Sequence, residues 1–553
     1  MLTRRCFLKT AGAAAASTLL GSMTCARDTR PNVVVLFSDE LAFEFLSCYG
    51  GDIETPNIDK LASQGLIFTN AYSAAPMCTP SRFSLLTGLY PGRWRHSRFL
   101  EEFPDDVPYS IAWNTFIGPE NIAITQRLSQ NGYLTGVTGK WHIGSFDADR
   151  EVPTLDPEDD PADPAVDEKL RQHQAAVVEQ VKKDVGCDMA INVSWDNFDS
   201  FPVKRLKYHN FPWINQGAIT FLEAAKKQKK PFFLYAATTA VHGPAHHDMF
   251  NHDLTYTPGG KNDDVLNYIP PVEEIKSKLA SEPPWKSHKI AGMACLDHHV
   301  ELVLDKIKEM GQEDNTIVIF LADHNVEPGK ATCYDKGNRV PMIIKWPQKI
   351  MPGSTSEALV QSVDIVPTLL ELAGLSAAVE QVDGKSLTPV FRHPASAIRT
   401  FVYLESGYSR AITDGQFKYI AFRPPRDAVE AMKIGLTKFA PNHLNVDRQA
   451  HSHIAIEHFP HYFDVDQLYD LARDPYEQKN IIDDPRYADK LAELKVELEK
   501  RLATFKHPFD LAVDPFLSGQ TYRRYAANTR AIGTDYIPWL PRDHGTIVWP
   551  PEE

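Results

Sequence analysis

A cysteine and an arginine four residues apart form the most chemically informative stretch of the chain. Cys78 and Arg82 flank Pro80, which favours the first turn of a helix, and Gly88 follows as a stop signal. A helix that begins here would direct its free backbone N–H groups and the positive end of its dipole toward the cysteine. The stretch therefore predicts an anion site beside a thiol, with a buried structural cysteine as the alternative.

Acidic residues follow two apolar runs that have the composition of buried strands. The runs are residues 32–38 and 316–321, and continuous β-branched runs of this kind suit strands buried on both faces of a parallel sheet. The polar residues that follow them are Asp39, Glu40, Asp323 and His324. Sites in such sheets lie at the carboxyl ends of the strands. Paired oxygen atoms there predict a site for a hard divalent cation, and solvated turns are the alternative.

Basic residues follow two further runs of the same type. Residues 134–138 lead into Lys140 and His142, and residues 232–238 lead into His242. A lysine and a histidine two residues apart in an extended segment point to the same side, so both can face one pocket. The alternative is a surface pair around a core tryptophan. A single histidine after a strand is weak evidence for a functional site. His242, however, belongs to the fourth predicted strand end that carries polar residues.

These motifs resemble the signature of the type I sulfatases, which belong to the alkaline phosphatase superfamily. The sequence Cys78-Thr79-Pro80-Ser81-Arg82, followed by Leu86-Thr87-Gly88, is similar to the family's Cys-x-Pro-Ser-Arg and Leu-Thr-Gly. Other segments similar to family motifs are Gly139-Lys140-Trp141-His142, His242-Gly243-Pro244, Asp323-His324-Asn325 and residues 328–341, which include Lys330. The chain departs from the family pattern at Glu40, Val241, Asp335 and Lys336.

The resemblance implies one post-translational change and one metal ion. The signature cysteine, Cys78, would be oxidised to formylglycine by a maturation enzyme, and the aldehyde would supply the nucleophile. One Ca²⁺ per chain would be bound close to it. The implied ligands are Asp39, Glu40, Cys78, Asp323 and His324. Oxygen ligands with a single nitrogen suit calcium better than zinc.

The resemblance also implies roles for the basic residues in hydrolysis of a sulfate ester. Arg82 and Lys140 would hold the hydrated aldehyde and offset its charge. Lys330 and His242 would contact the sulfate and the leaving oxygen, and His142 would accept a proton as sulfate is released. The expected substrate is a sulfated sugar or an oligosaccharide derived from a sulfated polysaccharide. The candidates for a sugar-binding rim are Arg95, His96, Trp195 and Trp213, although core packing accounts equally well for the tryptophans.

Two other functions stay open at this point. A phosphodiesterase or phosphonate monoester hydrolase of the same superfamily would use a similar set of metal ligands and cations. A non-catalytic glycan-binding homologue would keep the scaffold but lose several site residues, and none is lost in this sequence. A two-zinc phosphatase fits less well, because it would need more histidine ligands and a serine or threonine at position 78.

The expected fold is α/β, with a large, mixed but mostly parallel sheet between layers of helices. Residues 29–390 would form this catalytic domain, and residues 391–553 a smaller domain of antiparallel sheet plus helix, followed by a tail. Asp414-Gly415 predicts a two-residue hairpin turn, and residues 486–505 predict a helix on that sheet. The acidic segment 145–170 predicts a solvated insertion.

The start of the chain and its charge bear on location and partners. Arg4-Arg5 before a short apolar run resembles a twin-arginine signal, so residues 1–28 predict export to the periplasm of a Gram-negative bacterium. The run is too short for a permanent membrane span, and we do not expect lipid attachment at Cys25. The net charge of −14 argues against nucleic acid as a partner. The seven scattered cysteines form no disulfide framework.

Overall fold

The computed structural model describes residues 30–518, apart from 119–120, 145–152, 281, 283, 327–328, 376–377, 379–381, 427–428 and 430–457. The signal segment, Cys25 and the C-terminal tail therefore lie outside the described residues. Within these ranges no helix has the length and apolar character needed to cross a bilayer.

An eight-stranded sheet forms the centre of the protein, in the order β11-β2-β10-β9-β1-β6-β4-β5. Its strands are β1 (Asn32–Ser38), β2 (Leu66–Phe68), β4 (Leu134–Lys140), β5 (Met189–Ser194), β6 (Phe232–Ala237), β9 (Thr316–Ala322), β10 (Met342–Lys345) and β11 (Ser354–Ser356). β10 runs antiparallel to β9 and β2, and every other pair is parallel. The sheet is mixed but mostly parallel, which confirms the expected fold class.

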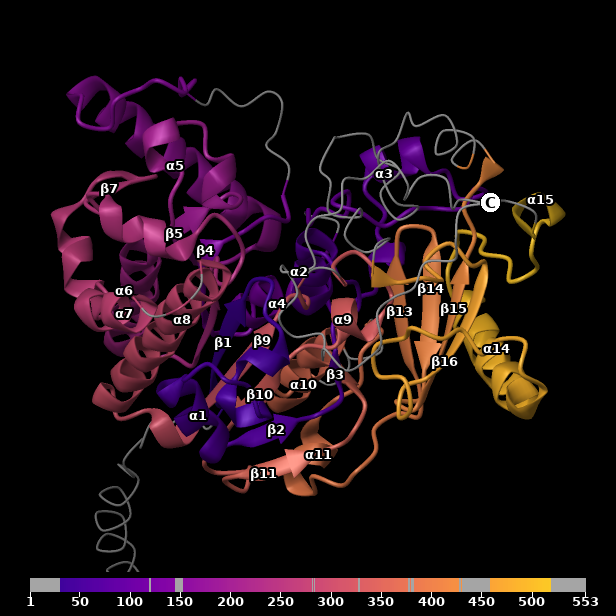
Figure 1. Cartoon of the computed structure of the whole chain (residues 1–553). Helices are drawn as coiled ribbons and strands as arrows, with labels where there is room; N and C mark the ends of the chain where they lie inside the picture. The colour runs from indigo at the N-terminus through magenta and orange to yellow at the C-terminus, as the bar shows by residue number, and fades with distance from the viewer. Residues whose placement is uncertain are drawn as a thin grey trace, which may run out of the picture.

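Helices cover both faces of this sheet (Figure 1). Alternate residues of β1 enter different cores: Val33 and Val35 pack with one cluster, and Val34 and Leu36 with the other. The first cluster includes α2 (Cys78–Thr87), α4 (Ile124–Ser129) and α10 (Ile365–Leu372). The second includes α1 (Pro56–Ser63), α6 (Phe211–Gln228) and α8 (Pro284–Glu309). Burial on both faces explains why these strands read as continuous apolar runs.

The four central strands bring their carboxyl ends together. β1 pairs in parallel with β9 on one side and β6 on the other, and β6 pairs in parallel with β4. Val34 lies opposite Leu234 in β6 and Val318 in β9, so neighbouring strands finish at similar heights. The residues that follow β1, β4, β6 and β9 therefore meet at one edge of the sheet.

A second, antiparallel sheet lies beside the first (Figure 1). It consists of β13 (Val402–Ser406), β14 (Ser409–Thr413), β15 (Phe417–Phe422) and β16 (Asp466–Asp470), in that order. One face packs against α14 (Ala488–Leu502), and the other contacts Tyr72 and Tyr334 of the large domain. This arrangement confirms the predicted C-terminal sheet and helix. The boundary at residue 390 stays a prediction.

The remaining described elements are short, with the exception of α5. They are β3 (Ala71–Tyr72), β7 (Tyr256–Thr257), β8 (Gly260–Lys261), β12 (Val360–Gln361), α3 (Ser97–Glu102), α5 (Pro164–Val185), α7 (Val272–Leu279), α9 (Asp335–Asn338), α11 (Thr388–Arg392) and α15 (Pro515–Ser518).

The acidic segment 145–170 includes the start of a helix, because α5 begins at Pro164, where Asp163 caps it by accepting a hydrogen bond of 2.8 Å from the Ala165 N–H. Most of residues 153–163 before it are exposed or half-buried, which is consistent with the predicted solvated insertion. The predicted hairpin turn needs correction. In the β14–β15 hairpin, Asp414 donates its N–H to the Phe417 carbonyl, so the turn is centred one residue later than predicted. Gly415 has φ of 92°, a value that favours glycine.

Candidate active site

Cys78 occupies the first position of α2, as the sequence predicts. Met77 before it is extended, and Gly88 ends the helix in the left-handed conformation with φ of 73°. All ten helical residues are buried, because α2 lies inside the first core cluster. The buried start of this helix therefore points its free N–H groups and its dipole at the Cys78 side chain.

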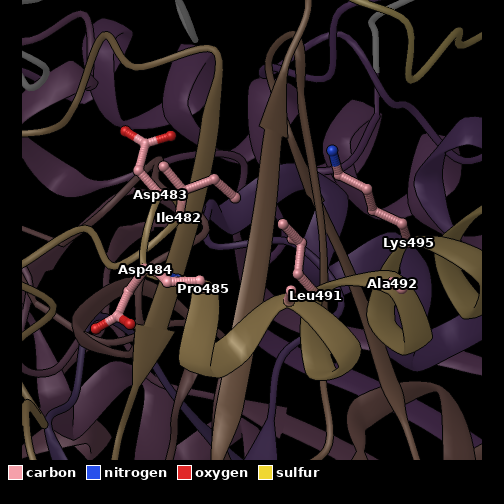
Figure 2. Close-up of a pocket in the computed structure, with 8 residues that line it drawn as sticks. Ile482, Asp483, Asp484, Pro485, Leu491, Ala492 and Lys495 are labelled. Carbon is pink, nitrogen blue, oxygen red and sulfur yellow. The ribbon is translucent and has the colours of Figure 1, made fainter.

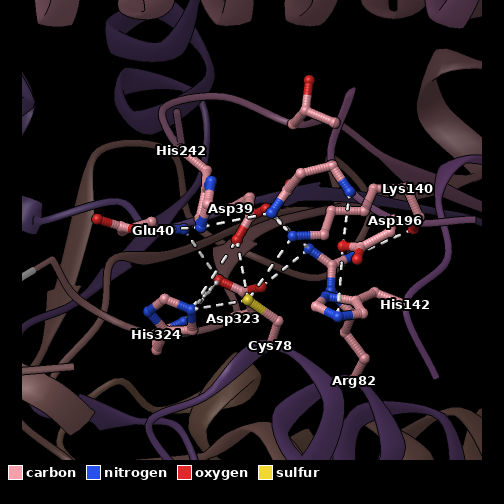
Figure 3. A network of polar contacts seen from close by, with 12 residues as sticks. Asp39, Glu40, Cys78, Arg82, Lys140, His142, Asp196, His242, Asp323 and His324 are labelled. Carbon is pink, nitrogen blue, oxygen red and sulfur yellow. Dashed lines mark hydrogen bonds and ion pairs between the residues drawn. The ribbon is translucent and has the colours of Figure 1, made fainter. Parts of the chain in front are cut away.

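Three potential metal ligands, Asp39, Asp323 and His324, converge on the Cys78 thiol, which is the fourth (Figure 3). Cys78 Sγ is 3.5 Å from Asp39 Oδ1 and 3.2 Å from His324 Nε2. Asp323 Oδ1 is 3.6 Å from the same His324 nitrogen. The four ligand atoms all lie within 4.8 Å of one another and are buried. Two carboxylates, one imidazole and residue 78 at this spacing fit a single divalent cation.

Two buried basic side chains, those of Lys140 and Arg82, neutralise the Asp39 and Asp323 carboxylates. Lys140 Nζ pairs with Asp39 and lies 3.6 Å from Cys78 Sγ. Arg82 donates a hydrogen bond of 2.9 Å to Asp323 Oδ2 and another of 3.1 Å to the Tyr235 hydroxyl. Tyr235 was not predicted as a site residue, because it lies inside β6 and belongs to no recognisable motif.

The pKa values of the site reflect these charges. Burial opposes ionisation of Asp39, but the positive charges around it, chiefly Lys140, hold its pKa well below its usual value. Burial and the charge of Asp39 raise the pKa of Asp323 to about 6. Burial and Asp39 also disfavour a thiolate at Cys78, yet the surrounding cations keep the pKa of this thiol well below its usual range. The site therefore favours an anion at position 78.

Glu40 lies next to the ligand group but outside it. Its backbone N–H donates to Asp323 Oδ1 at 3.0 Å, and its φ is 56°. The Glu40 Oε2 atom is 2.8 Å from Lys330 Nζ and 3.4 Å from His242 Nε2. Lys330 and His242 thus both lie beside Glu40, and their contact with a sulfate group stays a prediction. Metal ligation by Glu40 stays a prediction.

His142 reaches the site by a route that differs from the one predicted. β4 ends at Lys140, and His142 has φ of 53° instead of an extended backbone. Its Nε2 lies 3.3 Å from Asp196 Oδ1, and its carbonyl accepts a hydrogen bond of 2.9 Å from Thr79. Strand alternation therefore does not explain its position. Asp196 was not among the predicted site residues, and it follows β5, a half-buried strand that gave no apolar signal.

The proposed sugar-binding rim is only partly consistent with the structure. Trp213 is 2% exposed and packs with Phe198 and Val265, so the prediction that it lies on the rim is wrong. Trp195 packs against the core while partly exposed. His96 stacks on Trp94 with ring centroids 5.2 Å apart. A rim role for the residues other than Trp213 stays a prediction.

A shallow cavity of about 330 Å³ lies elsewhere, between the start of α14 and the chain before it (Figure 2). It is lined by Ile482, Asp483, Asp484, Pro485, Ala488, Leu491, Ala492 and Lys495. None of these residues belongs to the site around Cys78, and they carry no combination of nucleophile and base.

Comparison with known proteins gives a consistent result. The sulfatase family model matches residues 31–375, and a model described as N-sulphoglucosamine sulphohydrolase, C-terminal, matches residues 329–430. Human arylsulfatase A is 27% identical over 493 residues, which cover 82% of this chain and 83% of the relative. An N-acetylgalactosamine-6-O-sulfatase of Bacteroides thetaiotaomicron is 25% identical, with 85% and 94% covered. An ulvan-active sulfatase of Formosa agariphila is 26% identical, with 83% and 77% covered.

Solved structures support the same fold. A putative sulfatase from Bacteroides fragilis matches with a TM-score of 0.57 at 20% identity, covering 90% of this chain and 98% of that one. A structure in complex with its substrate D-glucosamine-2-N,6-O-disulfate matches with a TM-score of 0.55 at 19% identity, covering 86% and 98%. Because the family model spans more than half of the sequence, the chain belongs to the type I sulfatases of the alkaline phosphatase superfamily, which are sulfuric ester hydrolases.

Proposed function

We propose that this sulfatase hydrolyses sulfate esters of sugars, through a formylglycine formed at Cys78 by a maturation enzyme and with one calcium ion. The observation that carries the proposal is the position of Cys78 at the buried start of α2, where Asp39, Asp323 and His324 converge on its Sγ atom. That sulfur atom occupies the place that an oxygen would take after conversion. An oxygen there would complete a ligand set suited to calcium.

The surrounding residues supply charge and proton transfer. A bound calcium ion would draw charge from the sulfate oxygens and lower the pKa of a hydroxyl at position 78. Arg82 and Lys140 offset negative charge at the two carboxylates and at residue 78. Lys330 and His242, which meet on Glu40, are placed to bind the sulfate and the leaving oxygen. His142 is the remaining group that can accept a proton.

The relatives support a sulfated sugar as the substrate class. Two of them are named for ulvan and for N-acetylgalactosamine-6-sulfate, and one related structure holds a glucosamine disulfate. Relatives also include an arylsulfatase, so small aryl esters are a second class to test. The phosphodiesterase alternative draws on the same cations and ligands, and only turnover can separate the two.

A panel of esters tests the substrate proposal. We expect the matured protein to release sulfate from one class of sulfated oligosaccharide with a kcat/KM at least about tenfold above that for an aryl sulfate, because sugar contacts add transition-state binding. Released sulfate and phosphate would be measured for sulfated oligosaccharides, aryl sulfates and phosphodiesters. Faster turnover of phosphodiesters than of every sulfate ester would overturn the proposal.

We also propose that the protein is exported to the periplasm by the twin-arginine route. The proposal rests on Arg4-Arg5 and the short apolar run after them. Replacement of both arginines with lysine should leave the precursor in the cytoplasm of a Gram-negative host, which fractionation and immunoblotting would detect. Periplasmic protein in unchanged amount would contradict this route, and a parallel change of the nearby Lys9 to arginine serves as the control.

A further inference from the structure

The loop after β5 contacts both histidines of the site. Asp196 Oδ1 lies 3.3 Å from His142 Nε2, and Asn197 Nδ2 lies 3.4 Å from His242 Nε2. Figure 3 shows Asp196 beside His142 and Lys140, above the arginine of α2. Such contacts are often long before a substrate is bound and shorten in the reacting complex. This loop therefore places one polar side chain beside each histidine of the site.

Backbone hydrogen bonds fix this loop against the segment that carries His142. The Trp141 N–H donates to the Ser194 carbonyl and the His142 N–H to the Trp195 carbonyl, both at 2.8 Å. These bonds continue the parallel pairing of β4 and β5 beyond the ends of the two strands. The Asp196 carboxylate is held in turn by the Asn197 N–H at 2.6 Å. Its position relative to the imidazole is thus set by the main chain.

The charges at this point favour an ionised Asp196. Burial raises the pKa of its carboxyl, but His142 and Lys140 outweigh burial and hold the pKa below its usual value. A carboxylate can only accept hydrogen bonds, so the contact of 3.3 Å with Asp196 favours a hydrogen on Nε2 of the imidazole. The other ring nitrogen, Nδ1, is buried and has no hydrogen-bond partner within the part of the chain that the structure describes.

We infer that Asp196 is a positioning residue for His142. The carboxylate accepts the hydrogen on Nε2 and so fixes both the orientation of the ring and its tautomer. The electron pair of Nδ1 then stays available for a proton, which the ring can take without losing its contact with Asp196. This inference rests on the proposed function, in which His142 accepts a proton during hydrolysis of the sulfate ester.

Replacement of the carboxylate with an amide tests the inference. Asp196→Asn keeps the shape but can donate to Nε2 as well as accept, so the tautomer is no longer specified. We expect kcat to fall about 100-fold or more, within the range for loss of a proton-transfer group, while KM changes less than about threefold. Asp196→Glu should recover part of kcat, because a carboxylate is restored.

A measurement on the histidine itself separates positioning from a general structural effect. Nitrogen NMR of the protein labelled at histidine, assigned with His142→Gln, should show the Nε2–H tautomer in the parent and its loss in Asp196→Asn. This signal can be recorded on protein with an unconverted Cys78, so it does not depend on activity. Equal thermal unfolding of the parent and both Asp196 variants would show that the fold is intact.

Asp199→Asn provides the matched control, since Asp199 lies three residues further on and is exposed. It should keep the parental kcat and tautomer. Parental kcat or an unchanged tautomer in Asp196→Asn would overturn the inference and leave the proposed function intact, provided that the parent releases sulfate. Converted parent protein that hydrolyses no sulfate ester would instead refute the proposed function, and the NMR signal would still decide the role of Asp196.

Discussion

Replacing Cys78 with alanine is expected to abolish sulfate release, with a loss of at least about 10⁴-fold in kcat, as is typical when a covalent nucleophile is removed. The physical reason is that no other described side chain can take its place at the start of α2, where Asp39 and His324 lie within 3.5 Å of the Sγ atom. Mass spectrometry of the tryptic peptide should show an aldehyde at residue 78 in active parent protein. Sulfate release would be measured on the best ester of the panel.

We expect the Cys78→Ala variant to fold like the parent, so that its loss of activity can be assigned to the missing nucleophile. Cys78 makes no disulfide, and it is one of five free cysteines among the described residues. Cys295→Ala is the matched control, because Cys295 is also buried but lies in α8, in the second core cluster. It should lower stability and keep activity. Fully active protein that carries an unmodified Cys78 thiol would refute the formylglycine proposal.

Removal of calcium should cause the second large loss, in both activity and stability. The Asp39 and Asp323 carboxylates lie beside Lys140, Arg82 and His324, and the proposed cation would bind where these carboxylates converge with residue 78. A ligand that binds only the folded protein stabilises it by about 3 kcal/mol at a hundredfold excess over its Kd. We therefore expect chelation to lower the unfolding temperature and to stop turnover, and calcium to restore both. Scanning calorimetry and sulfate release would follow the two effects.

A pair of aspartate variants gives this experiment its control. Asp323→Asn should abolish the shift in unfolding temperature on calcium addition, because it removes one of the four converging ligands. Asp305→Asn, on the exposed side of α8, should leave that shift unchanged. Restoration of activity by zinc but not by calcium would contradict the calcium proposal and favour a phosphatase-like site.

The parts of the fold that could be predicted are those whose burial is uniform. Residues 32–38 were predicted as a strand and form β1, because both of its faces are buried and residues 33–37 are all apolar. The same reasoning located β9, although the strand extends one residue beyond the prediction, to Ala322. Since these strands are parallel and adjacent, the prediction that their polar ends form one site follows from the pattern alone.

The parts that could not be predicted depend on contacts between distant segments. β5 was missed because Asn192 interrupts its apolar run, in keeping with a strand in which Met189 and Ile191 are only half-buried. The contact between His142 and Asp196 joins residues 54 positions apart, and no local pattern encodes it. Trp213 was placed wrongly because an aromatic residue can pack in a core or line a binding rim. Its position depends on the residues around it in the folded chain, which are those of a buried cluster.

The start of α5 shows that composition can hide a helix signal. Asp163-Pro164 is a good capping pair, but it stands in a run of acidic residues and prolines that was predicted only as a solvated insertion, without a helix. The backbone at His142 could not be predicted either. His142 lies two residues beyond β4 in a left-handed conformation, and its N–H donates to the Trp195 carbonyl, a partner that no local pattern reveals.

The contact between the two sheets has a consequence for how such a chain can change during evolution. Lys418 of β15 lies in the buried interface and neutralises Asp335 and Glu477, while Ser406 donates a hydrogen bond of 2.8 Å to the carbonyl of Ala331. Ala331 directly follows Lys330, so the antiparallel sheet helps to hold the lysine that pairs with Glu40. Recombination that exchanged the C-terminal part of two sulfatases would combine the antiparallel sheet of one protein with the Lys330 loop of the other. We expect such chimaeras to stay active only where the crossover precedes that loop, so that the loop and the sheet come from the same parent.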